Sequence, residues 1–436
     1  MINKKILLLP FAAAALTGCT FGASIDTLMS PPKLSMEQEQ IYSALTDATG
    51  NNISLKYPKS GKYLSAFIVE DIDGDGGNEA LVFYEKNSLA VEENTLRISI
   101  LDKDGDNWSS VCDTPIDGSE IEKVMISRLG SSDRINLIIG SSQINRSEKN
   151  VSIYNYSDRN VQQVFPTSSY SFFDINDLDT DGENELLLLK GSSANAVAAV
   201  YRFDENGRYS KDSQQDLSGS FTEFENTIYG MIGSSRTGLY IDAVSGAGHI
   251  QSDVIYMDEN GLHKVFATAD ESFSTNRPSG CATFDIDNDG IPEIPVQKVS
   301  PGYDNAPESE QMMITEWMYV TDDNKLKKKY SSYYSVNEGY IFIFPERWEG
   351  RVKVKRDPIN DEIVFKSYIN GKEGSELLKL YCAEDQPSRE DRLANGYMLL
   401  HTKGDSAYLA YIPTETGKDG LTPAAGDVAV GFHFKE

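Results

Sequence analysis

Residues that commonly carry catalysis or cross-links are scarce in this sequence. The 436 residues include 4 histidines and 4 cysteines, and the histidines are scattered without the spacing of a metal site or a catalytic triad. The sequence has no nucleophile elbow, phosphate-binding loop or HExxH motif. It contains no recognisable catalytic constellation, and we therefore predict that the chain is not an enzyme.

Positive charge is also scarce. Lysine and arginine number 40, against 67 aspartates and glutamates, which gives a formal net charge of −27. Proteins that hold nucleic acid by releasing counterions need a surplus of basic residues. The composition therefore excludes a nucleic-acid partner of that kind.

The apolar run near the N-terminus, from Ile6 to Leu16, is too short to span a bilayer. Two lysines precede it, and the sequence Leu-Thr-Gly-Cys ends it at Cys19. This segment resembles a bacterial lipoprotein signal, in which the cysteine is acylated and becomes the first residue of the mature protein. We predict an exported lipoprotein, anchored through Cys19 on the extracellular face of a bacterial cell membrane.

The remaining cysteines show no disulfide framework. Cys112, Cys281 and Cys382 are left once Cys19 is assigned to the anchor, and they lie in distant segments. An odd number of cysteines with no regular spacing gives no pairing pattern. We expect buried thiols at these three positions.

An acidic nonapeptide with the pattern D-x-D-x-D-G-x-x-E occurs three times, at Asp71–Glu79, Asp177–Glu185 and Asp285–Glu293. Four carboxylates within nine residues repel one another unless a hard cation lies among them, and oxygen ligands at this spacing favour calcium. The glycine at position six permits a sharp turn, and the residue at position seven can offer its backbone carbonyl. The predicted ligands of about three structural Ca²⁺ ions are Asp71, Asp73, Asp75, Gly77, Glu79, Asp177, Asp179, Asp181, Glu183, Glu185, Asp285, Asp287, Asp289, Ile291 and Glu293.

The nonapeptides differ from EF-hand loops. An EF-hand needs a bidentate glutamate at position twelve, leading into a helix, whereas position twelve here is Val82, Leu188 or Val296. The fourth carboxylate comes earlier, at position nine, and a short apolar run follows it. Such runs are typical of strands, so each nonapeptide is predicted to join two strands.

This strand–loop–strand unit resembles the calcium loop of FG-GAP/VCBS repeats, which form integrin-type β-propeller blades in many bacterial surface proteins. The family pattern often ends in aspartate, whereas all three copies here end in glutamate. The resemblance implies a mainly β fold, a β-propeller of about 50-residue blades with D-x-D-x-D-G-x-x-E calcium loops.

The spacing of the nonapeptides indicates two blades per copy. Their first residues are 106 and 108 positions apart, which is too long for one blade. Two repeats without the carboxylates fall at residues 124–140 and 228–243. Five repeats are therefore clear, and the sequence leaves open whether a ring closes with five, six or seven blades. Hairpin turns are predicted at Asp104-Gly105, Asp158–Asn160, Asn206-Gly207, Asn260-Gly261 and Asp322–Asn324.

The segments on either side of the repeats lack the acidic nonapeptide and follow other sequence patterns. Ser35 and Gln38 form a capping-box pattern for a helix that begins at Met36 and ends near Thr49. Beyond the repeats, apolar runs and one helical stretch predict either a small α+β domain or two further degenerate blades, and we prefer the domain. The predicted division is signal peptide 1–18, tether 19–34, helix and lead-in 35–58, β-propeller 59–336, and C-terminal α+β domain 337–436.

These features give two hypotheses about function. The first is a membrane-anchored, non-catalytic binding module, whose calcium-stabilised propeller presents loops to an extracellular protein or glycan. The alternative is a secreted carbohydrate-active or other hydrolytic enzyme on a propeller scaffold, with acids on separate loops that no motif search finds. A carboxylate saturated by calcium cannot also transfer protons, so the nonapeptides would not supply those acids.

The anchor is tested by Cys19→Ala. Acylation requires the Cys19 thiol, so the variant is expected to leave the membrane fraction or to accumulate with its signal peptide attached. The measurement is cell fractionation with mass spectrometry of the mature N-terminus, and Cys112→Ala is the matched control. A Cys19→Ala protein that is processed and membrane-bound like the control contradicts the lipoprotein assignment.

Overall fold

The computed structural model describes residues 34–87, 96–144, 146–414 and 419–434. The signal peptide, Cys19 and all but the last residue of the tether lie outside the described residues. Within them the chain consists mainly of antiparallel β-strands, so the prediction of a mainly β fold is confirmed.

The first three sheets of the described chain follow one another in sequence. Sheet 1 contains β1 (Ile53–Leu55), β2 (Phe67–Glu70), β3 (Glu79–Lys86), β4 (Leu96–Asp104) and β5 (Asn107–Pro115). Sheet 2 contains β6 (Glu120–Arg128), β7 (Ile135–Ser142), β8 (Lys149–Ser157) and β9 (Asn160–Tyr170). Sheet 3 contains β10 (Phe172–Asn176), β11 (Glu185–Lys190), β12 (Val197–Phe203) and β13 (Tyr209–Asp216).

Three further sheets complete the described chain. Sheet 4 contains β14 (Phe224–Ile232), β15 (Arg236–Gly246), β16 (His249–Asp258), β17 (Gly261–Lys264) and β18 (Arg277–Pro278). Sheet 5 contains β19 (Ile294–Val299), β20 (Met313–Val320), β21 (Leu326–Ser335), β22 (Tyr340–Ile343) and β28 (Phe432–Phe434). Sheet 6 contains β23 (Val352–Asp357), β24 (Glu362–Ile369), β25 (Lys372–Ala383), β26 (Met398–Lys403) and β27 (Ser406–Tyr411).

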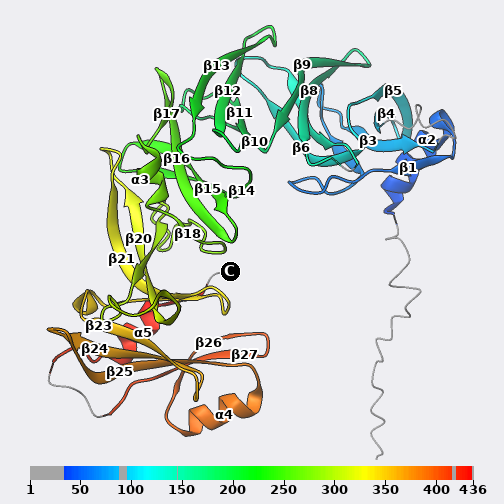
Figure 1. Cartoon of the computed structure of the whole chain (residues 1–436). Coiled ribbons are helices and arrows are strands. Elements are labelled where there is room, and N and C mark those ends of the chain that lie inside the picture. The colour runs from blue at the N-terminus through cyan, green and yellow to red at the C-terminus, as the bar shows by residue number, and fades with distance from the viewer. Residues whose placement is uncertain (1–33, 88–95, 145, 415–418, 435–436) are drawn as a thin grey trace, which may run out of the picture.

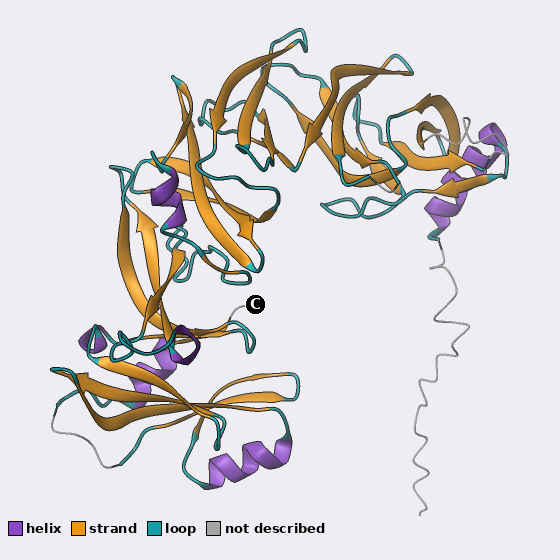
Figure 2. Cartoon of the chain, in the orientation of Figure 1, coloured by secondary structure: helices purple, strands orange, loops and turns teal. Residues whose placement is uncertain are grey.

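The sheets are arranged along an open arc, from sheet 1 at one end to sheet 6 at the other (Figure 1). Figure 2 shows that helices are few and lie mainly at the two ends of this arc. Within the described ranges the arc does not close into a ring (Figure 1). The described sheets therefore form an open arc and not a closed ring of five, six or seven blades.

Each inner sheet packs on both of its faces, which explains the continuous apolar runs after the acidic loops. Side chains of a strand alternate between the two faces of its sheet. In β11, Leu186 and Leu188 pack in a cluster with Ile138 of sheet 2, whereas Leu187 and Leu189 pack in a cluster with residues of sheet 4. A strand between two sheets is therefore apolar at every position rather than at every second one.

Helix α2 (Met36–Thr49) covers the face of sheet 1 that no other sheet covers. The predicted capping box is confirmed, because Ser35 and Gln38 exchange hydrogen bonds between side chain and backbone at 3.2 and 3.0 Å. Ile41 and Leu45 are fully buried in a cluster with β3 and β4. Burial of such side chains stabilises the fold by about 1.5–3 kcal/mol each. The helix therefore closes the first end of the stack of sheets.

The five predicted hairpin turns are confirmed. They join β4 to β5, β8 to β9, β12 to β13, β16 to β17 and β20 to β21, all in antiparallel register. At the β8–β9 turn, Asp158 and Arg159 have φ values of 52° and 60°. Two successive residues with positive φ are the mark of a type I′ turn, whose twist matches that of the strands.

The C-terminal segment shares a sheet and a core with the fifth repeat. β22 lies beyond the predicted boundary at residue 337, yet it pairs with β21 on one side and with β28 on the other. Phe342, Trp348 and Phe365 belong to one buried cluster that includes residues of sheets 5 and 6. The shorter elements of the chain are α3 (Ala269–Phe273), α4 (Gln386–Ala394), α5 (Ala425–Gly431) and the 3₁₀ turns Glu308–Glu310 and Glu346–Trp348.

The three cysteines within the described residues form no disulfide. Cys281 is buried, as expected, whereas Cys112 and Cys382 are only partly buried. Burial raises the pKa of the Cys382 thiol to about 11, so this group stays protonated at neutral pH.

Sheets 2 and 3 come into very close contact at Gly130. The φ of this residue is 60°, and a Cβ atom placed there would lie 1.8 Å from the carbonyl oxygen of Phe203. The Gly130 N–H also donates to the carbonyl oxygen of Asn184 at 2.9 Å. Only glycine fits this contact without moving one sheet away from the other.

Gly130→Ala is therefore expected to destabilise the protein more than Gly105→Ala does. Gly105 has the same φ of 60° but no neighbouring atom within 4 Å of the added carbon. The Gly105→Ala variant therefore measures the free-energy cost of a side chain at this backbone conformation alone. That cost is about 1 kcal/mol, and the clash at Gly130 adds about 1–3 kcal/mol. Denaturant unfolding of both variants measures the difference, and equal losses of stability contradict the close contact.

Candidate metal centres

The three acidic nonapeptides occupy equivalent places in sheets 1, 3 and 5. We call Asp71–Glu79 loop A, Asp177–Glu185 loop B and Asp285–Glu293 loop C. Loop A joins β2 to β3, and loop B joins β10 to β11. Loop C joins Phe284, which forms an isolated bridge with Glu293, to β19. The predicted strand–loop–strand arrangement is therefore confirmed for loops A and B, whereas loop C follows an isolated bridge instead of a strand.

The first aspartate of each loop binds the backbone of the turn. In loop B, Asp177 accepts hydrogen bonds from the N–H groups of Asp181 and Gly182 at 3.1 and 2.9 Å. Loops A and C repeat the bond from the sixth residue at 3.1 and 2.7 Å. The sixth residue has a φ between 87° and 92° in every loop, a conformation that requires glycine. The fixed turn keeps the aspartates on one side of the loop.

The glutamate at position nine is buried in each loop. Glu79, Glu185 and Glu293 are 6%, 1% and 0% exposed. Their Oε2 atoms accept a hydrogen bond from the N–H of the second loop residue at 2.9, 2.9 and 3.0 Å. Burial raises the pKa of Glu79 and of Glu185 to about 7. A buried carboxylate of this kind is stabilised when a positive charge lies against its second oxygen, Oε1.

Carboxylate oxygens converge within each loop. In each loop, three residues place one oxygen each within 4.8 Å of the others. They are Asp71, Asp73 and Glu79 in loop A, Asp177, Asp179 and Glu185 in loop B, and Asp285, Asp287 and Asp289 in loop C. Asp179 also has a buried Oδ1 atom that accepts no hydrogen bond from the described residues. These donors are all oxygens, which suit a hard cation such as calcium better than a thiophilic metal. The residues present therefore fit the predicted ion.

In each loop the backbone N–H of the seventh residue donates a hydrogen bond to the side chain of the fifth residue. Gly77, Glu183 and Ile291, the predicted carbonyl ligands, donate their N–H groups to the aspartate two positions earlier at 2.7, 2.9 and 2.9 Å. This bond turns each fifth aspartate back over the loop. Of the fifth-position aspartates, Asp289 is a member of the converging set of its loop, whereas Asp75 and Asp181 are not.

Loop B receives a basic side chain that the sequence analysis did not predict. Arg202 of β12 pairs with Asp179 and, at 2.9 Å, with Oδ2 of Asp181. The same guanidinium lies 3.7 Å from Oε1 of Glu185. Its Nε atom lies 3.3 Å from Oδ1 of Asp212, an acid of β13 outside the loop.

Loop C receives a lysine from a different strand. The Nζ atom of Lys329, in β21, lies 2.8 Å from Oδ2 of Asp287, 2.6 Å from Oδ2 of Asp289 and 2.8 Å from Oε1 of Glu293. Tyr330 donates its hydroxyl to Asp287 at 2.7 Å. Arg202 and Lys329 lie 17 and 36 residues after the ninth-position glutamates, so no local motif contains them.

Loop A has an acid where loop B has its arginine. Ala80 pairs with Leu101 in sheet 1 as Leu186 pairs with Tyr201 in sheet 3, so Asp102 and Arg202 follow at matching positions. Besides burial, the charge of Asp102 is among the causes that raise the pKa of Glu79. Among the described residues, no basic side chain pairs with an acid of loop A.

Loops B and C also bind the repeats that lack the carboxylates. Gly130 of sheet 2 donates its N–H to the carbonyl oxygen of Asn184 in loop B at 2.9 Å. Met231 of sheet 4 donates its N–H to the carbonyl oxygen of Gly290 in loop C at 2.8 Å. The carboxylate loops therefore stabilise the preceding sheets as well as their own.

A polar cavity of about 720 Å³ lies on the other side of the sheets from the acidic loops. Its lining comes from the connections β7–β8, β9–β10, β11–β12 and β13–β14, and includes Glu148, Lys149, Lys190 and Glu223. In an antiparallel sheet, connections from the second to the third strand lie at the opposite end from those between the first and second. The cavity is therefore separate from loops A, B and C.

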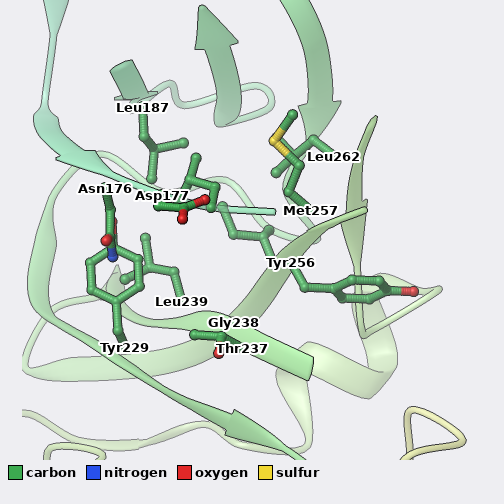
Figure 3. Close-up of a pocket in the computed structure, with 12 residues that line it drawn as sticks. Asn176, Asp177, Leu187, Tyr229, Thr237, Gly238, Leu239, Tyr256, Met257 and Leu262 are labelled. Carbon is green, nitrogen blue, oxygen red and sulfur yellow. The ribbon is translucent and has the colours of Figure 1, made fainter. Parts of the chain in front are cut away.

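A second cavity lies beside loop B and is shown in Figure 3. Asp177 of loop B and Tyr229, Leu239 and Tyr256 of sheet 4 are among its lining residues (Figure 3). Its volume is about 20 Å³, room for roughly one water molecule. This cavity is a packing gap between sheets 3 and 4 and is too small for an organic ligand.

No protein-family model and no curated protein matches the chain. Solved structures resemble it at low identity. The polysaccharide lyase Uly1 is 10% identical, with 83% of this chain and 92% of the lyase covered, at a TM-score of 0.31. The GH32 β-fructofuranosidase BmSUC1 of Bombyx mori is 13% identical, with 72% and 74% covered, at a TM-score of 0.28. An exo-β-1,3-galactanase from Phanerochaete chrysosporium is 12% identical, with 84% and 90% covered, at a TM-score of 0.27.

These neighbours are carbohydrate-active enzymes, and they contradict two predictions from the sequence. The predictions were that the chain is a non-catalytic binding module and that it is not an enzyme. Both depended on the lack of a catalytic motif, and a motif search does not detect acids that come from separate loops. Because each TM-score is below 0.5, the likeness assigns no reaction or substrate to this chain.

Among the described residues, no helix has the length and apolar composition needed to cross a membrane.

Proposed function

We propose that this chain is an exported calcium-binding protein in which loops A, B and C hold the ion as part of the fold. The observation that carries the proposal is the buried glutamate at position nine. One of its oxygens is used by the backbone of the loop. In loops A and B the glutamate also converges with two aspartates, whereas in loop C the second oxygen of Glu293 lies 2.8 Å from Lys329 and three aspartates converge instead. Bound calcium would supply the positive charge that these carboxylates require.

The positions within each loop would have different roles in calcium binding. The first aspartate and the sixth glycine fix the turn, the third and fifth aspartates supply oxygens, and the ninth glutamate closes the base of the loop. Extracellular calcium sites bind at roughly 10⁻⁴–10⁻³ M. At about 1 mM calcium, a site with a dissociation constant of 10⁻⁴ M adds about 1.4 kcal/mol to stability.

A cellular location and a type of repeat are proposed together with this function. A lipoprotein signal that ends at Cys19 would place the protein outside the cell, where calcium is abundant. The strand–loop–strand units support propeller-type repeats of the FG-GAP/VCBS kind, here set along an open arc (Figure 1). The predicted division into repeats over 59–336 and a C-terminal α+β domain over 337–436 would then need a different boundary, because β22 and β28 of the C-terminal segment complete sheet 5.

Chelation of calcium is expected to lower the melting temperature. Asp73→Ala, Asp179→Ala and Asp287→Ala should each reduce the calcium-dependent part of that temperature, because each removes a loop carboxylate. Asp106→Ala, at an exposed turn outside the loops, is the matched control. Calorimetry with calcium and with chelator measures the effect, and identical curves in both conditions contradict the proposal.

A second candidate function is a carbohydrate-active enzyme that uses the 720 Å³ cavity. This volume lies within the range of small-molecule sites. The cavity brings together Glu148 and Glu223, two solvent-exposed carboxylates from separate connections that form no ion pair with the described residues. Glycosidases use two carboxylates of this kind as acid and base or nucleophile. Phe224, which is partly exposed, adds aromatic surface for a sugar ring.

The test of this candidate is a screen of calcium-loaded protein against cell-envelope and extracellular polysaccharides. Release of new reducing ends is the measurement. Glu148→Gln and Glu223→Gln are each expected to lower any activity by 10²-fold or more, by roughly the contribution of one acid–base group. Glu205→Gln, at the exposed β12–β13 turn, should leave it unchanged. Activity that survives both cavity substitutions contradicts this assignment.

A further inference from the structure

The three acidic loops share one sequence pattern but differ in the charge that neighbouring strands bring to them. The inference drawn from this difference rests on the proposed function, because it concerns how tightly each loop holds calcium. Arg202 contacts three acids of loop B, and Lys329 contacts three acids of loop C. Loop A faces Asp102 instead.

We infer that Arg202 and Lys329 act as internal cations that compete with calcium, so that loop A is the tightest site, loop B is weaker and loop C is the weakest. Asp179 and Glu185, and likewise Asp287 and Glu293, use their oxygens on these side chains. Calcium must displace the basic group before it can use the same oxygens. Hydrogen bonds between charged groups are worth enough to lower affinity roughly tenfold to a hundredfold.

Loop A has the features of an open site. Glu79 is more than nine-tenths buried, and its Oε1 accepts no hydrogen bond and no ion pair from the described residues. Asp102 adds a further negative charge, which strengthens the attraction of a divalent cation. Asp102 accepts a hydrogen bond from the hydroxyl of Tyr156 at 3.1 Å and lies 3.6 Å from Arg159, and these contacts fix the position of its carboxylate.

Loop B differs from loop C in what its basic group can do when calcium arrives. Arg202 keeps a partner outside the loop, since its Nε lies 3.3 Å from Asp212. The guanidinium can therefore swing out of loop B and stay paired. Among the described residues, the ion pairs of Lys329 are all with acids of loop C, namely Asp287, Asp289 and Glu293. Its displacement leaves an ammonium without an acidic partner, which places loop C last in affinity.

The experiment measures each loop alone in the full chain. Single-loop proteins carry Ala in place of the third-position aspartate in the other two loops, Asp73, Asp179 or Asp287. Isothermal titration with calcium and terbium luminescence give the affinity of the remaining loop. The expected order of affinity is A, then B, then C, with roughly tenfold or more between A and C. Equal affinities, or a tighter loop C, overturn the inference.

Substitution of the basic residues tests the cause. Arg202→Gln should tighten loop B roughly tenfold or more, and Lys329→Gln should do the same for loop C, while Asp102→Asn should weaken loop A alone. Lys325→Gln, an exposed lysine of the same hairpin as Lys329, is the control that should change nothing. If circular dichroism shows that Lys329→Gln is unfolded, the order of the single-loop affinities decides the matter.

The outcomes separate this inference from the proposed function. Binding at all three loops with equal strength refutes the competition by Arg202 and Lys329 and leaves calcium binding in place. Failure of all three single-loop proteins to bind calcium refutes the proposed function itself. Unchanged affinity after Arg202→Gln and Lys329→Gln refutes the internal cations even where the order of affinities is as expected.

Discussion

The hydrogen bond between the ninth-position glutamate and the N–H of the second loop residue is the interaction on which each acidic loop depends. It closes the loop across its base and sets where the following strand begins. The same closure buries the carboxylate, and a buried negative charge is costly unless positive charge lies beside it. One residue thus fixes the shape of the loop and creates its need for a cation.

Sheet packing explains why these loops recur at regular places. An inner sheet is apolar on both faces, so it must be covered on both, and each sheet in the arc covers its neighbours. A stack of this kind has two exposed ends, and α2 covers the first of them with Ile41 and Leu45. At the other end, sheet 6 shares a core with the fifth repeat. The acidic loops lie at one edge of this stack and the large polar cavity at the other, so that ion binding and any ligand binding occupy different surfaces.

Features that depend on neighbouring residues in the chain could be predicted from the sequence. The helix that begins at Met36, the five hairpin turns and the strand–loop–strand units each follow from a capping residue, a turn sequence or an apolar run. The charge that surrounds each loop could not, because Asp102, Arg202 and Lys329 reach the loops through strand pairing and register. The same limit applies to the cavity, whose Glu148 and Glu223 are brought together only by the packing of sheets 2 to 4.

The contacts of Gly130 and Met231 with the following acidic loops give the chain a period of two sheets. Sheets 2 and 3 are joined through loop B, and sheets 4 and 5 through loop C, by the same kind of backbone hydrogen bond. The 106- and 108-residue spacing of the loops is the length of this pair. Loss or gain of a single sheet would place two acidic loops in adjacent sheets, or would leave a repeat that lacks the carboxylates without an acidic loop to contact. Loss or gain of a whole pair would preserve every type of interface, so an architecture of this kind can change length only in steps of two sheets.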